Sequence, residues 1–334
     1  MSAGQLTCAE LAEVQLKADQ VWADNASRKD YIANVDSITA LRTEQTATLA
    51  PLEDKDKDNT VKIAWIKDCD TTIAACTDEC TVGGAELEAA CDTHELDICR
   101  KVGFTVEEKA LRTSMFSKEE LIAKGMLRKM KLLDEYLNDQ AITVINANVG
   151  VNAYTGGKGT VAGFTTTIPA AYWNSSLFSY FVLAMKKNKF ADAWLLSGDN
   201  LYEAWWNAMM NKSVPDASAD AAKFDTFRKY FDVNALDALL TPDKKTFLID
   251  RGALAFASKA YWPTTPVDYI GAGLTKYSIP SKNLPGVMYD VTYTTRCVSD
   301  KIYHDFSIQM KAGIFVNPKG CNLNSTGILE FKCA

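Results

Sequence analysis

Hydrophobic residues recur at helical spacing over the long stretch 117–148. Five of them share one face of the predicted helix: Ile122, Met126, Met130, Leu133 and Leu137. Ser117 followed by Glu120 is a capping-box pattern, which marks the start of a helix. At about 1.5 Å per residue, some 30 residues make a helix roughly 45 Å long, far above the usual three turns. A helix of this length is typical of proteins that tile a surface, so the pattern favours an architectural role.

A second pattern is the alternation of apolar and polar residues in two runs, 61–67 and 96–106. Because a tip with two glycines, Gly83 and Gly84, lies between the runs, they predict an extended β-hairpin that spans 61–116. No nearby sequence covers its apolar face, and an outstretched hairpin with one apolar face needs a neighbouring subunit. We therefore expect an intersubunit interface that contains Val61, Ile63, Trp65, Leu96 and Ile98.

The first 60 residues differ from the rest of the chain in their pattern of apolar and polar residues. An amphipathic helix is predicted from Leu6 to Asn25. The segment after it, as far as Asp58, is polar and ends in mixed charges, so it cannot bury much surface. Residues 1–60 are therefore interpreted as an N-terminal arm.

Residues 117–334 are predicted to form a mixed body that includes the long helix. Helical patterns cover 169–189, 201–210 and, more weakly, 219–230, whereas strands are predicted at 193–197, 246–250, 254–257, 289–296, 306–316 and 327–333. A turn is expected at 317–320, where Pro and Gly occur together. Runs of helices followed by runs of strands predict the α+β class.

Composition and charge narrow the range of functions. The chain has 334 residues, of which 47% are hydrophobic and 23% charged, as in ordinary globular proteins. Its formal charge of −6 argues against a dedicated nucleic-acid binder, which would normally be basic. The first residues lack a basic, apolar secretory signal, and no apolar run is long enough to span a membrane. We therefore expect a soluble protein made in a cytoplasm, with no membrane partner.

Candidate catalytic chemistry is sparse. His94 and His304 are the only histidines, and there is no Gly-x-Ser-x-Gly motif. The stretch 156–160 departs from a phosphate-binding loop, because Asn152 and Gly159 stand where the motif needs Gly and Ser or Thr. We predict neither an enzyme nor a cofactor. Four aromatic residues are interpreted as core rather than as a ligand site: Trp194, Tyr202, Trp205 and Trp206.

The number of cysteines, nine, is the one unusual feature of the amino-acid composition. Five of them lie within 31 residues: Cys69, Cys76, Cys80, Cys91 and Cys99. Disulfides that staple the hairpin tip, a zinc site with His94, and free thiols are three alternatives that the spacing leaves open. Cys321 and Cys333 flank a predicted C-terminal hairpin and form a further candidate disulfide. Because the total is odd, a monomer keeps at least one unpaired thiol.

The order of arm, long β-excursion, long helix and mixed body resembles the major capsid proteins of tailed bacteriophages, the Hong Kong 97 type. Four stretches also look like capsid proteins from phages of Bacteroidetes-type hosts: 103–106, 117–148, 315–321 and 327–331. The resemblance lies in element order and texture over most of the chain, without a diagnostic signature motif. Some members of that family cross-link through Lys and Asn side chains, but no matching motif is visible here.

The resemblance implies a structural protein that forms pentamers and hexamers and assembles into the icosahedral, DNA-containing head of a virion in a bacterial cytoplasm. Portal, scaffolding or decoration proteins would then be partners, and packaged DNA would be a neighbour without sequence-specific contact. Two alternatives remain. One is a cysteine-stapled surface or secreted binding protein of the adhesin kind, and the other is a tail-tube or decoration protein of a virion.

Overall fold

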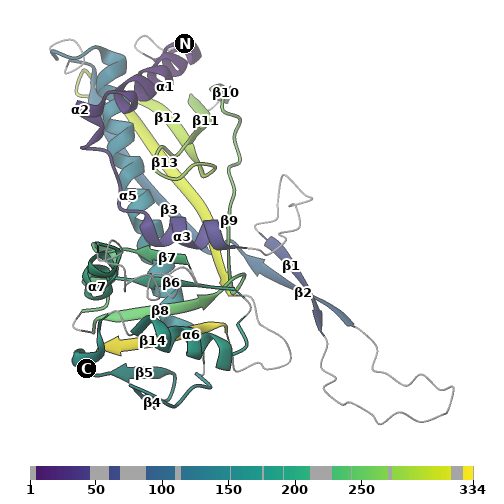
Figure 1. Ribbon diagram of the computed structural model, residues 1–334. Coiled ribbons are helices and arrows are strands. Elements are labelled where there is room, and N and C mark those ends of the chain that lie inside the picture. The colour runs from purple at the N-terminus through teal and green to yellow at the C-terminus, as the bar shows by residue number, and fades with distance from the viewer. Residues whose placement is uncertain are drawn as a thin grey trace.

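The computed structural model describes residues 5–45, 60–67, 88–109, 114–150, 152–174, 177–190, 192–210, 228–241, 243–269, 273–316 and 326–333. Within these ranges only the backbone is described at 60, 62–67, 88–93 and 207–210. Figure 1 shows a body of two stacked parts, each built on a β-sheet, with the long helix α5 running along the first part and reaching the second. The first sheet has the strand order β10-β11-β12-β13-β3, with β9 also paired to β13, and the second has the order β4-β5-β14-β8-β6-β7.

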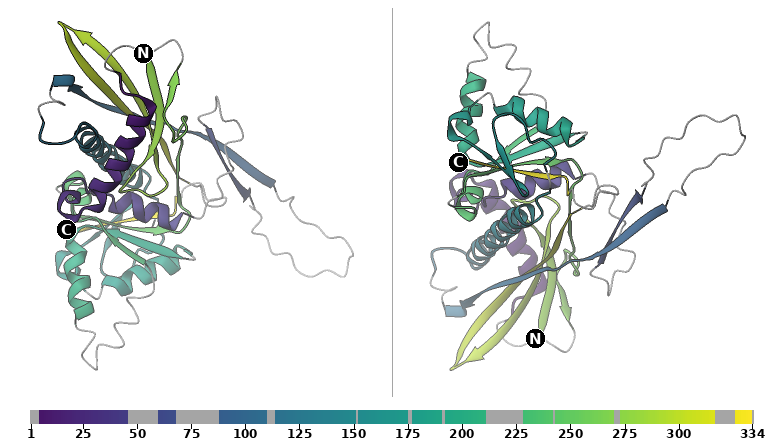
Figure 2. Two further views of the ribbon diagram at one scale, coloured as in Figure 1. Left: turned by 90° about the horizontal axis from the view of Figure 1, so that it is seen from above. Right: turned by 90° about the horizontal axis from the view of Figure 1, so that it is seen from below.

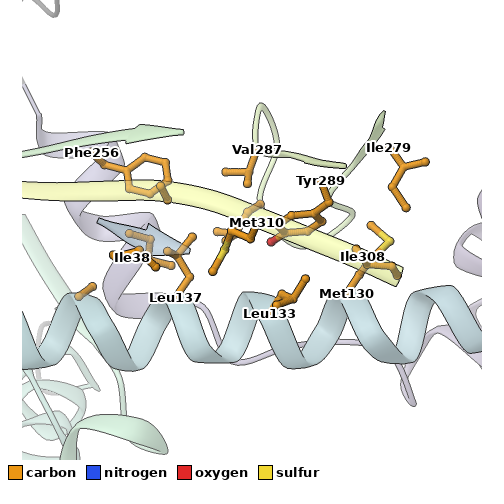
Figure 3. Close-up of a cluster of buried hydrophobic side chains, with 14 of the residues drawn as sticks. Ile38, Met130, Leu133, Leu137, Phe256, Ile279, Val287, Tyr289, Ile308 and Met310 are labelled. Atoms are coloured by element: carbon orange, nitrogen blue, oxygen red, sulfur yellow. The ribbon is translucent and has the colours of Figure 1, made fainter. Parts of the chain in front are cut away.

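The helix α5 (Lys118–Ala147) confirms the longest sequence pattern. Ser117 caps it by accepting a hydrogen bond from the Glu120 backbone, while the Glu120 carboxylate pairs with Lys124 at 2.8 Å. All five residues of the predicted stripe are at most 3% exposed: Ile122, Met126, Met130, Leu133 and Leu137. Figure 3 shows Leu133 and Leu137 pointing from α5 toward the strand that carries Met310. The stripe therefore places α5 across the inner face of the first sheet.

The first sheet is antiparallel throughout and is built around one long strand. Its strands are β10 (Val267–Tyr269), β11 (Leu274–Pro280), β12 (Met288–Val298), β13 (Lys301–Val316), β3 (Ile98–Glu107) and β9 (Leu254–Ser258). Residues 303–312 of β13 pair with β3, and residues 312–316 pair with β9, so β13 joins both to β12. Ser299 and Asp300, both at positive φ, form the two-residue turn between β12 and β13.

The second sheet is mixed and buried on both faces at its centre. Its strands are β4 (Thr160–Ala162), β5 (Thr165–Ile168), β14 (Ile328–Cys333), β8 (Lys245–Asp250), β6 (Ala193–Ser197) and β7 (Arg228–Phe231). One face packs on α6 (Leu177–Lys187) and α7 (Asp199–Met210), which follows from a cluster that joins Phe181, Leu201 and Phe331. The opposite face, with Trp194 and Phe247, joins the same hydrophobic cluster as α5. A short 3-10 turn (Ala170–Tyr172) precedes α6, and α9 (Ala235–Leu239) follows β7.

The N-terminal segment corrects one sequence interpretation. α1 (Cys8–Ala23) is the predicted amphipathic helix, and it starts with a complete capping box between Thr7 and Glu10. The following residues were expected to be an extended arm, but they form α2 (Asn25–Arg28) and α3 (Asp36–Glu44). Ile38 and Leu41 of α3 are at most 1% exposed. This segment is therefore part of the body's core as far as residue 44, and the remainder of the predicted arm, 46–59, lies outside the described residues.

Buried carboxylates hold this segment in place. Asp232, fully buried after β7, accepts hydrogen bonds from Ser37 Oγ at 2.7 Å and from Asn138 Nδ2 of α5 at 2.8 Å. Burial raises the pKa of Asp232, but hydrogen bonds from Asn138, Asn34, Ala235 and Ser37 outweigh it and bring that pKa below its usual value. The result is one charged centre that joins the N-terminal segment, α5 and α9.

A second carboxylate, Glu44 at the end of α3, connects the two parts of the body. It is 2% exposed, and it accepts hydrogen bonds from Arg228 Nη1 at 2.5 Å and Tyr230 Oη at 2.6 Å, both on β7. Burial and then the Glu44 carboxylate raise the pKa of Tyr230 to about 12. The N-terminal segment thus spans from the first sheet to the second.

Two other sequence predictions were wrong. Residues 228–230, placed in helix-like material, form strand β7 instead, while 211–227 lie outside the described residues. The predicted C-terminal hairpin is absent from the described chain, because β13 and β14 belong to different sheets and β14 pairs with β5 and β8. The turn expected at 317–320 lies outside the described residues.

Candidate subunit interface

The two-stranded β-excursion is the feature that projects from the body. β1 (Thr60–Lys67) pairs antiparallel with β2 (Glu88–Glu95), from Thr60 opposite Glu95 to Lys67 opposite Glu88. Figures 1 and 2 show these two strands projecting away from the body in all three views. A projecting hairpin was expected, but its second strand was placed at 96–106. That run instead forms most of β3 and pairs with β13 in the body.

The base of the excursion is a small hydrophobic cluster within the same chain. Val61 and Leu96 are 2% and 3% exposed, and they cluster with Ala255 of β9 and Phe315 of β13. The ring of His94, the second-last residue of β2, lies over Phe315 with centroids 5.0 Å apart. These contacts anchor both strands of the excursion where they leave the body.

This anchoring corrects the basis of the predicted interface. Val61 and Leu96 belong to the base cluster, and Ile98, 8% exposed, belongs to the main core with α5. The side chains of these three residues are therefore covered by their own chain. Ile63 and Trp65 pair through their backbones with Asp92 and Ala90, and their side chains lie outside what the structure describes. Their place in an interface stays a prediction.

The cysteine predictions are tested only in part. Cys99 is an exposed free thiol on β3, where its sulfur accepts a hydrogen bond from Gln309 Nε2. Cys69, Cys76, Cys80 and Cys321 lie outside the described residues, as does the side chain of Cys91. Cys333 ends β14 and is half-buried. In the described part of the chain no group of three or more His, Cys, Asp or Glu side chains could hold a metal ion, and the zinc alternative falls mainly on residues outside that part.

His304 has a structural setting in the first sheet. It is fully buried on β13, with Nε2 2.6 Å from a Glu108 carboxylate oxygen and Nδ1 2.9 Å from Tyr293 Oη. Tyr293 Oη in turn accepts a hydrogen bond from the Leu6 backbone at 2.9 Å. Burial and surrounding carboxylates raise the pKa of Tyr293 to about 12, although the bond from Leu6 opposes this. The network ties the start of α1 to β12, β13 and the end of β3. Sequence reasoning gave no signal of this, because its members are far apart along the chain.

The aromatic residues near α7 divide into two groups. Trp194 on β6 is 2% exposed and is core, as expected. Trp205 is half-buried, whereas Tyr202 and Trp206 are 40% and 49% exposed, so the interpretation of these two as core was wrong. They lie one helical turn apart with stacked rings, centroids 6.3 Å apart. Tyr202 and Trp206 do have the helical spacing that the sequence shows, but their side chains face outward.

No helix in the described ranges is both long enough and apolar enough to cross a membrane.

No protein-family model matches the sequence, and a search of curated proteins finds no relative. Solved structures do match. The capsid asymmetric unit of cyanophage A-1(L) aligns over 90% of this chain and 93% of that chain, with a TM-score of 0.51 and 12% identity. A chain from Mycobacterium phage Che8 aligns over 86% of this chain and 92% of its own (TM-score 0.44, 14% identity), and the capsid of Ralstonia phage GP4 over 83% and 84% (TM-score 0.43, 12% identity).

The similarity to the A-1(L) capsid chain is one of fold, and it extends over nearly the full length of both chains. It confirms the predicted α+β fold of capsid type.

Proposed function

We propose that this chain is the major capsid protein of a tailed bacteriophage of the Hong Kong 97 type. The observation that carries the proposal is the capsid fold, matched over 90% of the chain, together with a β-excursion that projects beyond the body. Two strands that pair only with each other are marginal alone in water, so packing on a neighbouring copy would complete them.

In this proposal the chain assembles with itself into pentamers and hexamers, and these close into an icosahedral head that contains DNA. Ile63 and Trp65 of β1 lie over a neighbouring subunit. Portal, scaffolding or decoration proteins are further partners, and assembly takes place in the host cytoplasm. The formal net charge of −6 fits a shell protein that lies beside packaged DNA better than a protein that binds DNA tightly. The host assignment, a Bacteroidetes-type phage, rests on the sequence stretches alone.

The test is the state of the purified protein. We expect sedimentation velocity at micromolar concentrations, over several salt concentrations, to show capsomers or shells, and negative-stain microscopy to show closed particles. A well-folded monomer under every condition would contradict the proposal. Such a monomer with oxidised cysteines would instead favour the adhesin alternative.

A further inference from the structure

Two exposed surfaces, on the helices α6 and α7 that pack on the second sheet, have complementary chemistry. The first, called here the aromatic surface, consists of Tyr202, Glu203 and Trp206 of α7. The second, called the lysine surface, consists of Leu183, Lys186, Lys187 and Lys189 in and after the last turns of α6.

The aromatic surface is large, rigid and negatively charged. The stacked rings of Tyr202 and Trp206 rest on Trp205, which packs against Phe231 of β7 with centroids 5.2 Å apart. Glu203, also on α7, is exposed and forms no ion pair with any described residue. Aromatic residues held rigidly at a surface lose little conformational freedom on binding, which suits them to an interface centre.

The lysine surface has the opposite charge and its own apolar residue. Leu183 is 47% exposed, and Lys186 and Lys187 are exposed in the last turn of α6. The helix dipole stabilises positive charge at the C-terminal end of α6, so it favours the charged form of these lysines there. Lys189, at φ 58°, follows the helix, and none of the three lysines forms an ion pair with the described chain.

The two surfaces lie over different strands of the second sheet. α7 packs on β7 through Trp205 and Phe231, whereas α6 packs on β14 through Phe181 and Phe331, whose rings are 4.8 Å apart. β8 and β6 separate β14 from β7. At about 4.8 Å per strand, the two contact lines are roughly 14 Å apart. A head-to-tail contact between identical copies brings two different surfaces together, so it requires two surfaces of complementary chemistry rather than one self-complementary surface.

We propose that the aromatic surface of one copy docks on the lysine surface of the next copy within a ring. This inference rests on the proposed capsid function and names one of its interfaces. Lysine ammonium groups would lie over the Tyr202 and Trp206 rings, Glu203 would pair with a lysine, and Leu183 would fill the space beside them. The chain already uses lysine–aromatic pairs internally, with Lys276 4.3 Å from the centre of the Trp262 ring.

Charge reversal with rescue tests this pairing directly. We expect Glu203→Lys alone to weaken assembly, and Lys186→Glu and Lys187→Glu each to do the same, because like charges would face each other. Combining Glu203→Lys with the lysine reversal that forms the pair should restore assembly toward the wild-type level. Lys29→Glu, an exposed lysine on the first part of the body, is the matched control and should assemble normally. Sedimentation velocity gives the assembled fraction, and circular dichroism melts confirm that each variant is folded.

A second variant tests the apolar part of the contact. Trp206→Ala should weaken assembly by roughly tenfold or more, as truncation of a central interface aromatic does, while the subunit's melting temperature stays close to wild type. Tyr172→Ala, another exposed aromatic, is its control.

The outcomes separate this inference from the proposed function. If the wild type forms shells and all these variants do too, the capsid proposal stands and the docking of these surfaces is wrong. Loss of assembly in both reversals without rescue in either combination also overturns the direct pairing. Variants of the lysine surface that assemble normally but retain less nucleic acid would assign that surface to DNA and overturn the inference. A wild type that never assembles overturns both proposals.

Discussion

At the residue scale, the apolar stripe of α5 shows why some positions could be read from sequence. Leu133 is 1% exposed and faces β13, whereas its neighbour Leu132 is 49% exposed. The helical period alone separates these two leucines, since 100° of rotation per residue moves Leu132 off the buried face of α5. The exposure of Trp206 could not be read in this way, because a helix with aromatics on two sides does not reveal which side the sheet covers.

The two leucines give a matched test of the stripe. We expect Leu133→Asp to lower the free energy of unfolding by several kcal/mol, because it places an unpaired charge in a packed interior. Leu132→Asp makes the same chemical change at the surface and should alter it by less than about 0.5 kcal/mol. Urea denaturation of the subunits measures both. Equal losses would mean that the inner face of α5 is assigned wrongly.

Asp232 predicts a component of the pH dependence of stability. Its pKa in the folded chain lies below the usual value, so its contribution is present above the unfolded pKa and is lost as pH falls through the folded one. Between about pH 5 and pH 3 the wild type should therefore lose more stability than Asp232→Asn does. Asp134, whose pKa is raised by burial, contributes with the opposite sign, so the difference between variant and wild type is the quantity to measure.

The measurement for Asp232 is a series of urea unfolding curves at successive pH values. Asp30→Asn, at an exposed position, is the control and should follow the wild type over the whole range. If Asp232→Asn keeps the full acid sensitivity of the wild type, the carboxylate does not carry the role that its hydrogen bonds indicate.

At the element scale, the long periodic or uniformly apolar elements were predictable and the short or polar ones were not. α5, β6 and β8 correspond closely to their predicted ranges. β2 has the sequence Glu-Ala-Ala-Cys-Asp-Thr-His-Glu, which shows no alternation, so the run 96–106 was taken as the hairpin's second strand. The true partner of that run, β13, lies about two hundred residues away, and local pattern carries no information about such pairing.

The base and the outer part of the excursion should respond differently to truncation. Leu96→Ala removes a residue of the buried base cluster and should cost the isolated subunit about 2 kcal/mol or more. Trp65→Ala should leave the subunit's melting temperature almost unchanged and weaken shell assembly, as expected for an aromatic residue at an interface. Thermal melts and sedimentation on both variants make the comparison. A large loss of subunit stability in Trp65→Ala would show that this residue packs in its own chain's core.

At the scale of the whole molecule, the two sheets are expected to unfold together. The largest hydrophobic cluster contains Phe247 and Ile249 of the second sheet, Ile308 and Met310 of the first, and the inner face of α5. Glu44 adds a polar link between α3 and β7. A continuous core of this kind is typical of one cooperative unit, although the chain is long enough for two domains.

Hydrogen exchange tests this cooperativity. The slowest amides of β8 and β13 should exchange with the same free energy of opening, and Leu133→Asp should lower both by the same amount, although Leu133 points toward the first sheet. Leu132→Asp should leave both unchanged. Amides of β1 and β2 should exchange faster in the isolated subunit, because these strands pair only with each other, and should become protected in shells. If Leu133→Asp speeds exchange in β13 and leaves β8 as slow as before, the two parts are separate folding units and α5 does not couple them.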